Sequence, residues 1–233
     1  TILLQNFLIM GQTSKFCNNI VVHNMQIYDC FSDGIHIRFA NNVHCYSNFI
    51  SNCQHEGIFW TCVVNGLAEA NKIAGITSDC MRCDNCVTFL VKNNYFYSYT
   101  GNNNSQAPKG WQNGIQVADA GASKGYDASN KPLSTKDGEI TGNTFANTGE
   151  KAVWLDSTGK GYDNVYIHDN TFINVNVFTN AGHSVSVDIT AINASVPTYQ
   201  NTTGVIIPSK ETSELIFSSI FDILNLNYTT TAK

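Results

Sequence analysis

Charged residues are scarce in this chain: they make up 13 % of its 233 residues, and the formal net charge is −5. Lysine and arginine form no cluster, so the electrostatic footprint that nucleic acids and anionic membranes require is missing. No apolar run approaches the roughly 18 residues that a membrane-spanning helix needs. We therefore expect neither a nucleic-acid partner nor insertion into a membrane, and we expect a surface that is polar through Asn, Ser, Thr and Gly.

Helical periodicity and hairpin signals are also lacking. What recurs instead is a short strand of alternating apolar residues that ends at asparagine, a residue that tolerates the left-handed conformation of tight corners. Asparagine side chains that stack in this way can hydrogen-bond from one copy to the next. Copies of this phrase lie at residues 19–25, 42–49, 87–96, 139–145 and 165–172. Short strands with such corners indicate an all-β solenoid.

A second phrase sets the period of the solenoid. Asp33, Glu56 and Asp79 each open a turn, and they are evenly spaced: 56 − 33 = 23 and 79 − 56 = 23. A period in the twenties is typical of a solenoid in which each repeat forms one coil. The sequence therefore predicts a right-handed parallel β-helix of about 7–8 coils with loop insertions.

A β-helix of this length is normally one domain, so we expect residues 1–233 to form a single one. The first residues already have the pattern of a strand, which indicates a piece of a larger protein. Beyond Asn94 the repeats lengthen, and we expect the extra residues in loops at 99–112, 118–138 and 188–203, where insertions often wall a binding face. Residues 213–223 fit a final coil better than a short capping helix.

Stacked in register, the three acids would form a column of carboxylates about 4.8 Å apart. Two charges at this separation repel by roughly 3 kcal/mol at an effective dielectric constant of about 20. The column therefore needs a cation, a raised pKa or open water around it, and calcium is the cation that we consider for Asp33, Glu56 and Asp79. The alternative is that these acids only belong to turn dipeptides with solvated side chains.

Residues of suitable chemistry surround the column. Three residues on from the acids lie His36, Phe59 and Arg82, again in steps of 23. Arg38, His55, Trp60 and Trp154 belong to the same wall or its edge. Together with the acids, these residues suit a sugar chain, because indoles stack on sugar faces while carboxylates act as acid, base or cation ligand. Each residue taken alone is equally compatible with a structural role. The candidates for catalysis are Asp33, His55, Glu56, Asp79 and Arg82, and those for substrate binding are His36, Arg38, Trp60, Lys151 and Trp154.

The eight cysteines all lie within the first 86 residues. Cys30 and Cys53 share the 23-residue step, and their parallel Cβ vectors disfavour a disulfide, so we expect a ladder of small buried side chains. Cys80, Cys83 and Cys86 are three residues apart, which in a strand puts successive residues on opposite faces and argues against zinc. We therefore predict no metal site at the cysteines.

Three segments resemble a known family. Residues 33–39, 55–59 and 81–85 read DGIHIRF, HEGIF and MRCDN, and they resemble the catalytic β-helix of disaggregatase over roughly residues 6–117. That family comprises archaeal cell-surface enzymes that break down a chondroitin-like matrix polysaccharide, within the pectate-lyase-like β-helix superfamily. The resemblance implies the same fold and an acidic polysaccharide as substrate.

By this resemblance, polar groove residues of the family correspond to Asp33, His55, Glu56 and Arg82. The chain departs from the family pattern at three positions, where the family has a basic Arg-type residue, an aspartate and a small residue. These positions are His36, Glu56 and Cys80.

Three functions compete. An acid-rich column favours a glycoside hydrolase, because hydrolysis needs a general acid and a base or nucleophile at a defined separation. A polysaccharide lyase would instead use Arg82 or a bound cation to neutralise a uronate, and His36, His55 or Lys151 to remove the α-proton. A surface module that binds glycans without turnover is the third. All three fit an extracellular or cell-surface protein, with which sequons at Asn103, Asn193, Asn201 and Asn227 are compatible.

Overall fold

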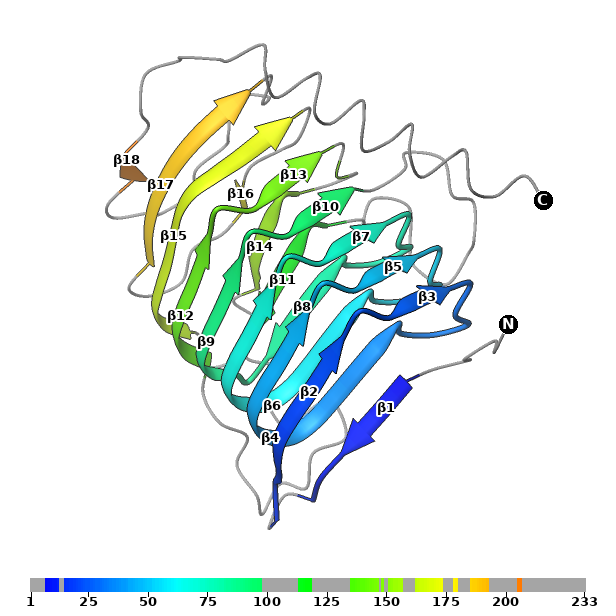
Figure 1. The fold of residues 1–233 in the computed structure, drawn as a ribbon. Helices are drawn as coiled ribbons and strands as arrows, with labels where there is room; N and C mark the ends of the chain where they lie inside the picture. The colour runs from blue at the N-terminus through cyan, green and yellow to red at the C-terminus, as the bar shows by residue number, and fades with distance from the viewer. Residues whose placement is uncertain are drawn as a thin grey trace, which may run out of the picture.

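The structure is a computed structural model. Its strands wind into a right-handed parallel β-helix that rises from the blue N-terminal coils to the yellow and orange ones (Figure 1). All pairings between the described strands are parallel, which confirms the predicted fold class. The structure describes residues 7–12, 15–97, 113–118, 135–146, 148, 151–156, 162–173, 178–179, 185–192 and 205–206.

Each coil crosses three faces. The first face consists of β1 (Phe7–Met10), the first halves of β4 (Ile35–Tyr46) and β6 (Ile58–Glu69), β8 (Met81–Asp84), β11 (Ile115–Ala118), β14 (Val153–Asp156) and β16 (Phe178–Thr179). The second consists of β2 (Cys17–His23), the second halves of β4 and β6, β9 (Val87–Lys92), β12 (Thr135–Thr141), most of β15 (Tyr162–Ile173), β17 (Val185–Ile192) and β18 (Val205–Ile206). The third consists of β3 (Gln26–Tyr28), β5 (Phe49–Ser51), β7 (Lys72–Ala74), β10 (Tyr95–Tyr97), β13 (Thr144–Ala146) and the end of β15.

The 23-residue step is the register of the first coils. Ile35 of β4 pairs with Ile58 of β6, and Ile58 pairs with Met81 of β8. A shift by one residue would turn every side chain to the opposite face, so the hydrophobic pattern holds this register. The predicted period is confirmed.

Left-handed residues form the corners between faces. Asn42 and Asn65 have φ values of 57° and 58°, and they lie where β4 and β6 pass from the first face to the second. Asparagine tolerates this conformation because its short polar side chain hydrogen-bonds locally. Here the bond runs between coils, since Asn65 Nδ2 donates to Asn42 Oδ1 at 3.2 Å. The same asparagine therefore forms the corner and bonds one coil to the next.

A second asparagine ladder is buried where the second face meets the third. Asn48 Nδ2 donates to Asn71 Oδ1 at 2.9 Å, and the same oxygen accepts the backbone N–H of Asn48 at 3.0 Å. Each amide also donates to a backbone carbonyl, as Asn71 Nδ2 does to Cys45 O at 2.9 Å. The predicted coil-to-coil bonding is confirmed. The ladder consists of Asn48, Asn71, Asn94, Asn143 and Asn170.

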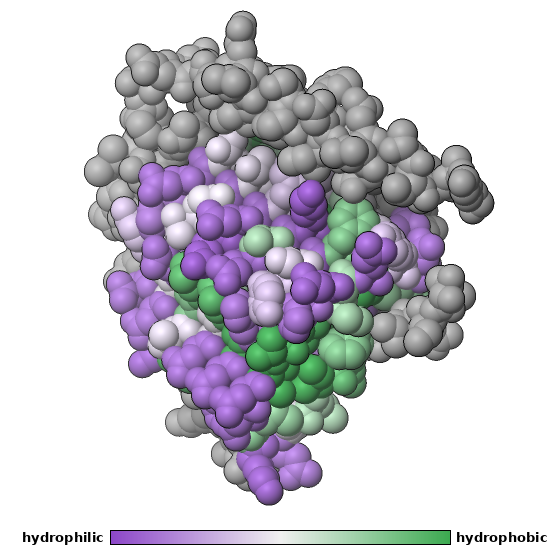
Figure 2. Space-filling model, viewed as in Figure 1, coloured by the Kyte–Doolittle hydropathy of each residue, from purple (hydrophilic) through white to green (hydrophobic). Residues whose placement is uncertain are grey.

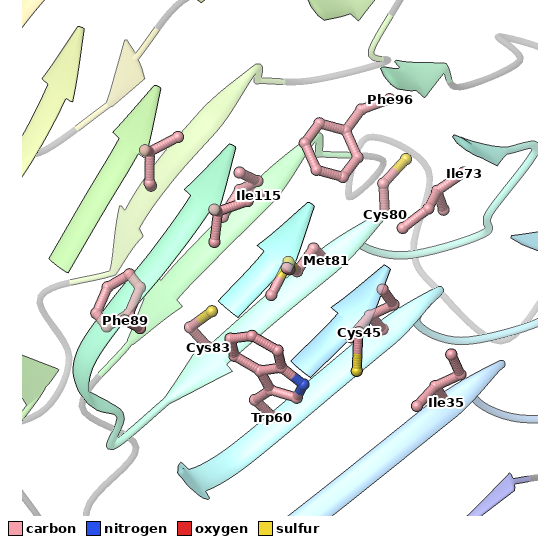
Figure 3. Close-up of a cluster of buried hydrophobic side chains, with 14 of the residues drawn as sticks. Ile35, Cys45, Trp60, Ile73, Cys80, Met81, Cys83, Phe89, Phe96 and Ile115 are labelled. Atoms are coloured by element: carbon pink, nitrogen blue, oxygen red, sulfur yellow. The ribbon is translucent and has the colours of Figure 1, made fainter. Parts of the chain in front are cut away.

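Trp60 lies in the core, which Figure 3 shows in part. It follows the outward-facing Phe59, and alternate residues of a strand point to opposite faces, so its indole points inward and is fully buried. Gly66 makes room for it, because a Cβ there would lie 2.6 Å from the ring. The prediction that Trp60 binds substrate is therefore wrong.

The cysteines belong to this core as well. Cys30 and Cys53 are buried, and all eight cysteines are free thiols, which confirms the expected ladder. Cys80, Cys83 and Cys86 are also fully buried members of the core. The expectation that successive members of this trio lie on opposite faces is wrong, because they sit around corners and not along one straight strand.

Two of the predicted loops are shorter than expected. Strand β12 already begins at Thr135, and β17 extends to Ile192, so parts of 118–138 and 188–203 are strand. The predicted loop at 99–112, the final coil at 213–223 and the four sequons lie outside the described residues. Within the described part of the chain, no helix has the length and apolarity that a membrane crossing demands.

Candidate active site

The three acids of the column occupy the corner that leads into the first face. The backbone N–H of Gly34 donates to Glu56 O at 2.9 Å, and that of Gly57 donates to Asp79 O at 3.0 Å, so the acids stack on successive coils. A Cβ at Gly57 would lie 2.5 Å from a carbonyl oxygen of the next coil, so glycine is required there. Asp33, Glu56 and Asp79 are at most 3 % exposed. This burial excludes the alternative of solvated turn side chains.

His55 joins the first two acids. Its Nδ1 lies 2.7 Å from Asp33 Oδ1 and in contact with Glu56 Oε2. The second oxygen of Asp33 lies 2.9 Å from His36 Nδ1, and the backbone N–H of Glu56 donates to Asp33 Oδ1 at 3.2 Å. We call Asp33, His36, His55 and Glu56 the acid–histidine cluster. Within this cluster, the Asp33 carboxylate has the most hydrogen-bond partners.

Arg82 connects this cluster to Asp84. Its Nη1 lies 3.4 Å from Glu56 Oε1, and its Nε donates to Asp84 Oδ1 at 2.9 Å. The guanidinium carbon lies 5.3 Å from the ring centroid of Phe59, and Phe59 stacks on His36 with centroids 4.4 Å apart. A planar guanidinium held by two carboxylates and a ring has one orientation. Arg82 therefore fixes the position of the Glu56 carboxylate.

Asp79 has a separate partner. Asn113 Nδ2 donates to Asp79 Oδ1 at 2.7 Å. Asn113 occupies the column position on the next coil, and Lys151 occupies it one coil further, because the backbone N–H of Gly114 donates to Lys151 O at 2.8 Å. Lys151 Nζ lies 4.3 Å from the ring centroid of Trp154. The predicted position of Lys151 at the level of the acids is confirmed.

The hydrogen bonds within the acid–histidine cluster shift the pKa values of Asp33 and His55 in opposite directions. Burial opposes ionisation of Asp33, but the hydrogen bonds from His36 and His55 outweigh it and hold the pKa of Asp33 well below its usual range. Burial likewise opposes charge on His55, yet its bonds to Asp33 and Glu56 raise its pKa to about 10. At neutral pH the structure therefore pairs an ionised Asp33 with a protonated His55.

The other two column acids shift in the opposite direction. Burial raises the pKa of Glu56, and the negative charge of Asp33 adds to this, although His55 and Arg82 oppose it. Burial, followed by the charge of Glu56, raises the pKa of Asp79 to about 8. The raised pKa was one of three ways in which the column could exist. In this molecule both Glu56 and Asp79 have a raised pKa, which reduces the charge repulsion within the column.

His55 is the most exposed member of the acid–histidine cluster. Its side chain is 42 % exposed, whereas those of Asp33 and Glu56 are 4 % and 0 % exposed. Phe59 and Trp154 are partly exposed on the same outer face, and the register aligns Phe59, Arg82, Gln116 and Trp154 on successive coils. A ligand that approaches the first face would meet His55 and these rings first.

Arg38 lies on the neighbouring row of this face. It follows His36 by two residues, so both side chains point outward. Its guanidinium carbon lies 5.7 Å from the ring centroid of Phe39, and its row continues through Thr61 and Asp84. The structure thus brings nine of the ten predicted residues to one corner and one outer face, and it removes Trp60.

A cation could bind within the acid–histidine cluster. One ligand atom from each of Asp33, His55 and Glu56 lies within 4.8 Å of the other two. Asp79 does not join this group, and calcium prefers oxygen ligands throughout. A donor set with an imidazole fits a first-row transition metal better than the calcium considered for the column.

Three buried polar residues of the site escape sequence reasoning: Asp84, Asn113 and Gln116. Asn113 precedes Gly114 as Asp33 precedes Gly34, so the repeated phrase carries a signal for it, and Gln116 then falls at the position of Arg82. Asp84 follows Arg82 by two residues, which places both on one side of the strand. From the sequence, Arg82 could neutralise either Asp79 or Asp84, and the structure pairs it with Asp84.

Comparisons with known proteins add little. No family model and no curated protein sequence matches the chain. Among solved structures, the chain is similar to a double mutant of the tailspike protein of E. coli bacteriophage HK620 in complex with a pentasaccharide, with 12 % identity and a TM-score of 0.36. The match covers 84 % of this chain and 43 % of the tailspike chain, so the chain spans less than half of that protein's length. The fold itself rests on the strand pairing described above.

Proposed function

We propose that this protein is a glycoside hydrolase that cleaves a polysaccharide at the acid–histidine cluster. The observation that carries the proposal is the convergence of Asp33 and Glu56, whose ligating oxygens lie within 4.8 Å of each other on adjacent coils. Retaining glycosidases hold two carboxyl groups about 5–5.5 Å apart. The pair therefore favours a retaining mechanism over an inverting one.

The environments of the two acids support distinct roles. Burial raises the pKa of Glu56, so we assign it the role of general acid for the leaving oxygen. Asp33, whose pKa is held low by two histidines, stays ionised and is the nucleophile. Two carboxyl groups whose environments push their pKa values apart are the usual mark of an acid–base assignment. Arg82 positions Glu56 and does not itself react.

Access to the pair is controlled by His55. Its imidazole lies between the two carboxylates and solvent, so it must rotate when the sugar enters. Phe59 and Trp154 offer ring faces for sugar stacking, and Lys151 adds a positive charge beside Trp154. These neighbours suit a sugar chain that carries negative charge.

The substrate class and the location follow from the resemblance to disaggregatase. It supports an acidic, chondroitin-like matrix glycan as substrate and an extracellular or cell-surface protein. For a lyase on the same glycan, the pKa of about 10 leaves His55 protonated at neutral pH and unable to remove an α-proton, so His36 or Lys151 would have to be the base.

The test is the release of reducing ends from chondroitin, polygalacturonate and a neutral glucan. We expect cleavage of an acidic glycan by the wild-type protein and a loss of about 10²–10⁴-fold in kcat for Glu56→Gln and Asp33→Asn. Glu69→Gln is the matched control, because Glu69 pairs with His44 and Lys92 on the second face. It should retain full activity.

The same assay separates the competing functions. New absorbance of unsaturated uronate products would identify a lyase, and reducing ends without that absorbance a hydrolase. Cleavage that persists in both Glu56→Gln and Asp33→Asn would refute the assignment of the pair. Binding of the glycans without cleavage by the wild-type protein would leave a binding module.

A further inference from the structure

A second concave surface lies on the second face, away from the acid–histidine cluster. It is a groove of about 500 Å³ that crosses four coils, from β6 through β9 and β12 to β15. These strands face the viewer in Figure 1, and Figure 2 shows hydrophobic residues among hydrophilic ones on this side. The volume falls within the range of about 300–1,000 Å³ that is typical of ligand sites.

One wall of the groove is polar. It is formed by the row of left-handed corner residues, Asn65, Thr88, Asp137 and Asn164, all of which are exposed. Asn164 Nδ2 donates to Asp137 Oδ1 at 2.8 Å, so the row is held in place by bonds between coils. This wall presents amide, hydroxyl and carboxylate groups along the axis of the β-helix.

The opposite wall is mostly apolar. Leu67 pairs with Leu90, Leu90 with Glu139 and Glu139 with Tyr166, so these side chains form one outward row. Tyr166 is 41 % exposed, and its ring stacks on His168 with centroids 4.1 Å apart. The ring is therefore held in one orientation while one of its faces stays open to a ligand.

The floor between the walls is rigid. It includes the backbone of Gly66 and Gly138, whose inward sides are filled by aromatic rings. A Cβ at Gly66 would lie 2.6 Å from the ring of Trp60, and one at Gly138 would lie 2.1 Å from that of Phe89. A groove that cannot collapse loses little entropy when a ligand binds.

The charge of the groove selects against anions. Its lining contains two acids, Asp137 and Glu139, and no lysine or arginine. His168 Nε2 lies 2.9 Å from Glu139 Oε1, and its Nδ1 lies 2.8 Å from Asp169 Oδ2, so each imidazole nitrogen already faces a carboxylate. A uronate or sulfated sugar would meet the carboxylates of Asp137 and Glu139 here, and no lysine or arginine of the lining would attract it.

We propose that this groove binds a neutral saccharide chain along the axis of the β-helix. A sugar ring is amphipathic: its C–H face would pack on Tyr166 and Leu90, and its hydroxyls would bond to the corner row at Asn65 and Asp137. The groove is thus a binding site separate from the acid–histidine cluster, and it prefers a neutral sugar chain where the cluster prefers a negatively charged one. This inference does not depend on the proposed hydrolase activity.

The test is isothermal titration of the full chain with cellohexaose, chitohexaose and a chondroitin hexasaccharide. We expect a neutral hexasaccharide to bind and Tyr166→Ala to weaken it about fivefold to tenfold, the effect of losing a stacked ring. Tyr166→Phe should keep the affinity. Tyr28→Ala is the matched control, because Tyr28 is also 41 % exposed but lies on the third face.

The variant Glu56→Gln separates the two sites. Binding of the neutral saccharide that persists in Glu56→Gln and is lost in Tyr166→Ala supports the groove. The inference is overturned if neither neutral hexasaccharide binds, if Tyr166→Ala and Tyr28→Ala bind equally well, or if chondroitin binds in a way that depends on Tyr166. Unchanged thermal unfolding of Tyr166→Phe and Tyr166→Ala shows that loss of binding is not loss of fold.

Discussion

Asp79 makes the stability of this protein depend on pH. Its pKa in the folded chain is raised to about 8 from an ordinary value of 3.8, first by burial and then by the charge of Glu56. The folded state therefore holds the proton more tightly than the unfolded state, and stability falls as pH rises from the lower value to the higher one. His55 acts in the same direction between 6.5 and about 10.

This linkage gives a prediction at the residue scale. Asp79→Asn keeps the acceptor for Asn113 but cannot ionise, so we expect it to raise Tm by at least about 3 °C at about pH 9 and to change it little at about pH 4. Differential scanning calorimetry across this range measures the effect. Asp137→Asn, which alters an exposed acid, is the control and should follow the wild type. Equal Tm gains at both pH values would show that Asp79 does not titrate as described.

At the scale of the structural element, the buried asparagine ladder stabilises the stack of coils. Asn71 Oδ1 accepts both the side-chain and the backbone N–H of Asn48, while Asn71 Nδ2 donates to Cys45 O and to Asn94 Oδ1. Removing this amide deprives the backbone N–H of Asn48, one of its side-chain N–H groups and the carbonyl of Cys45 of a partner, and each buried group left without one costs about 1–3 kcal/mol.

We therefore expect Asn71→Ala to lower the free energy of unfolding by about 2–4 kcal/mol, as measured by urea denaturation. Asn41→Ala is the control, because Asn41 Nδ2 donates to Asn18 Oδ1 at an exposed position. It should cost less than about 1 kcal/mol. A similar loss in both variants would mean that burial of the ladder does not matter.

Strand β6 shows how an element decides the role of its residues. Phe59 faces outward beside Arg82, while the next residue, Trp60, packs in the core. Chemical type alone favours Trp60 as a sugar-binding residue, and only the alternation of the strand removes it. Its indole also needs glycine at position 66, because a Cβ there would clash with the ring. Trp60 and Gly66 lie on the two halves of β6, which bends around a corner.

At the scale of the whole molecule, the repeat predicts that one coil can be removed. Deleting residues 44–66 joins Val43 to Leu67, and because Val43 pairs with Gly66 the remaining strands keep their register. We expect this variant to fold cooperatively with a parallel β spectrum by circular dichroism, although it lacks His55 and Glu56. Deleting 44–65 instead shifts every later side chain by one position and turns apolar side chains outward.

The shorter deletion is thus the matched control and should not fold. If both deletions fold equally well, register is not what the 23-residue step encodes. If neither folds, a coil-specific contact outweighs the repeat. Trp60 and Gly66 are removed together in the longer deletion, so it leaves no cavity from this pair.

By itself, the sequence determined the fold class, the period, the asparagine ladders and the column of acids. These follow from translation along the solenoid axis: residues separated by one repeat occupy the same place, so a step of 23 residues is enough to stack Asp33 on Glu56 and His36 on Phe59. No knowledge of distances is needed for that inference.

Only the tertiary structure decided burial, protonation and the partners of the charges. The bond from Asn113 to Asp79 spans 34 residues and a break in the 23-residue period, so the repeated phrase marks the position of Asn113 but does not predict its bond. The pairing of Arg82 with Glu56 and Asp84, and the opposed pKa shifts of Asp33 and Glu56, depend on which groups from neighbouring coils surround each acid. Those surroundings exist only once the coils are stacked, because electrostatics and desolvation act through space and not along the chain.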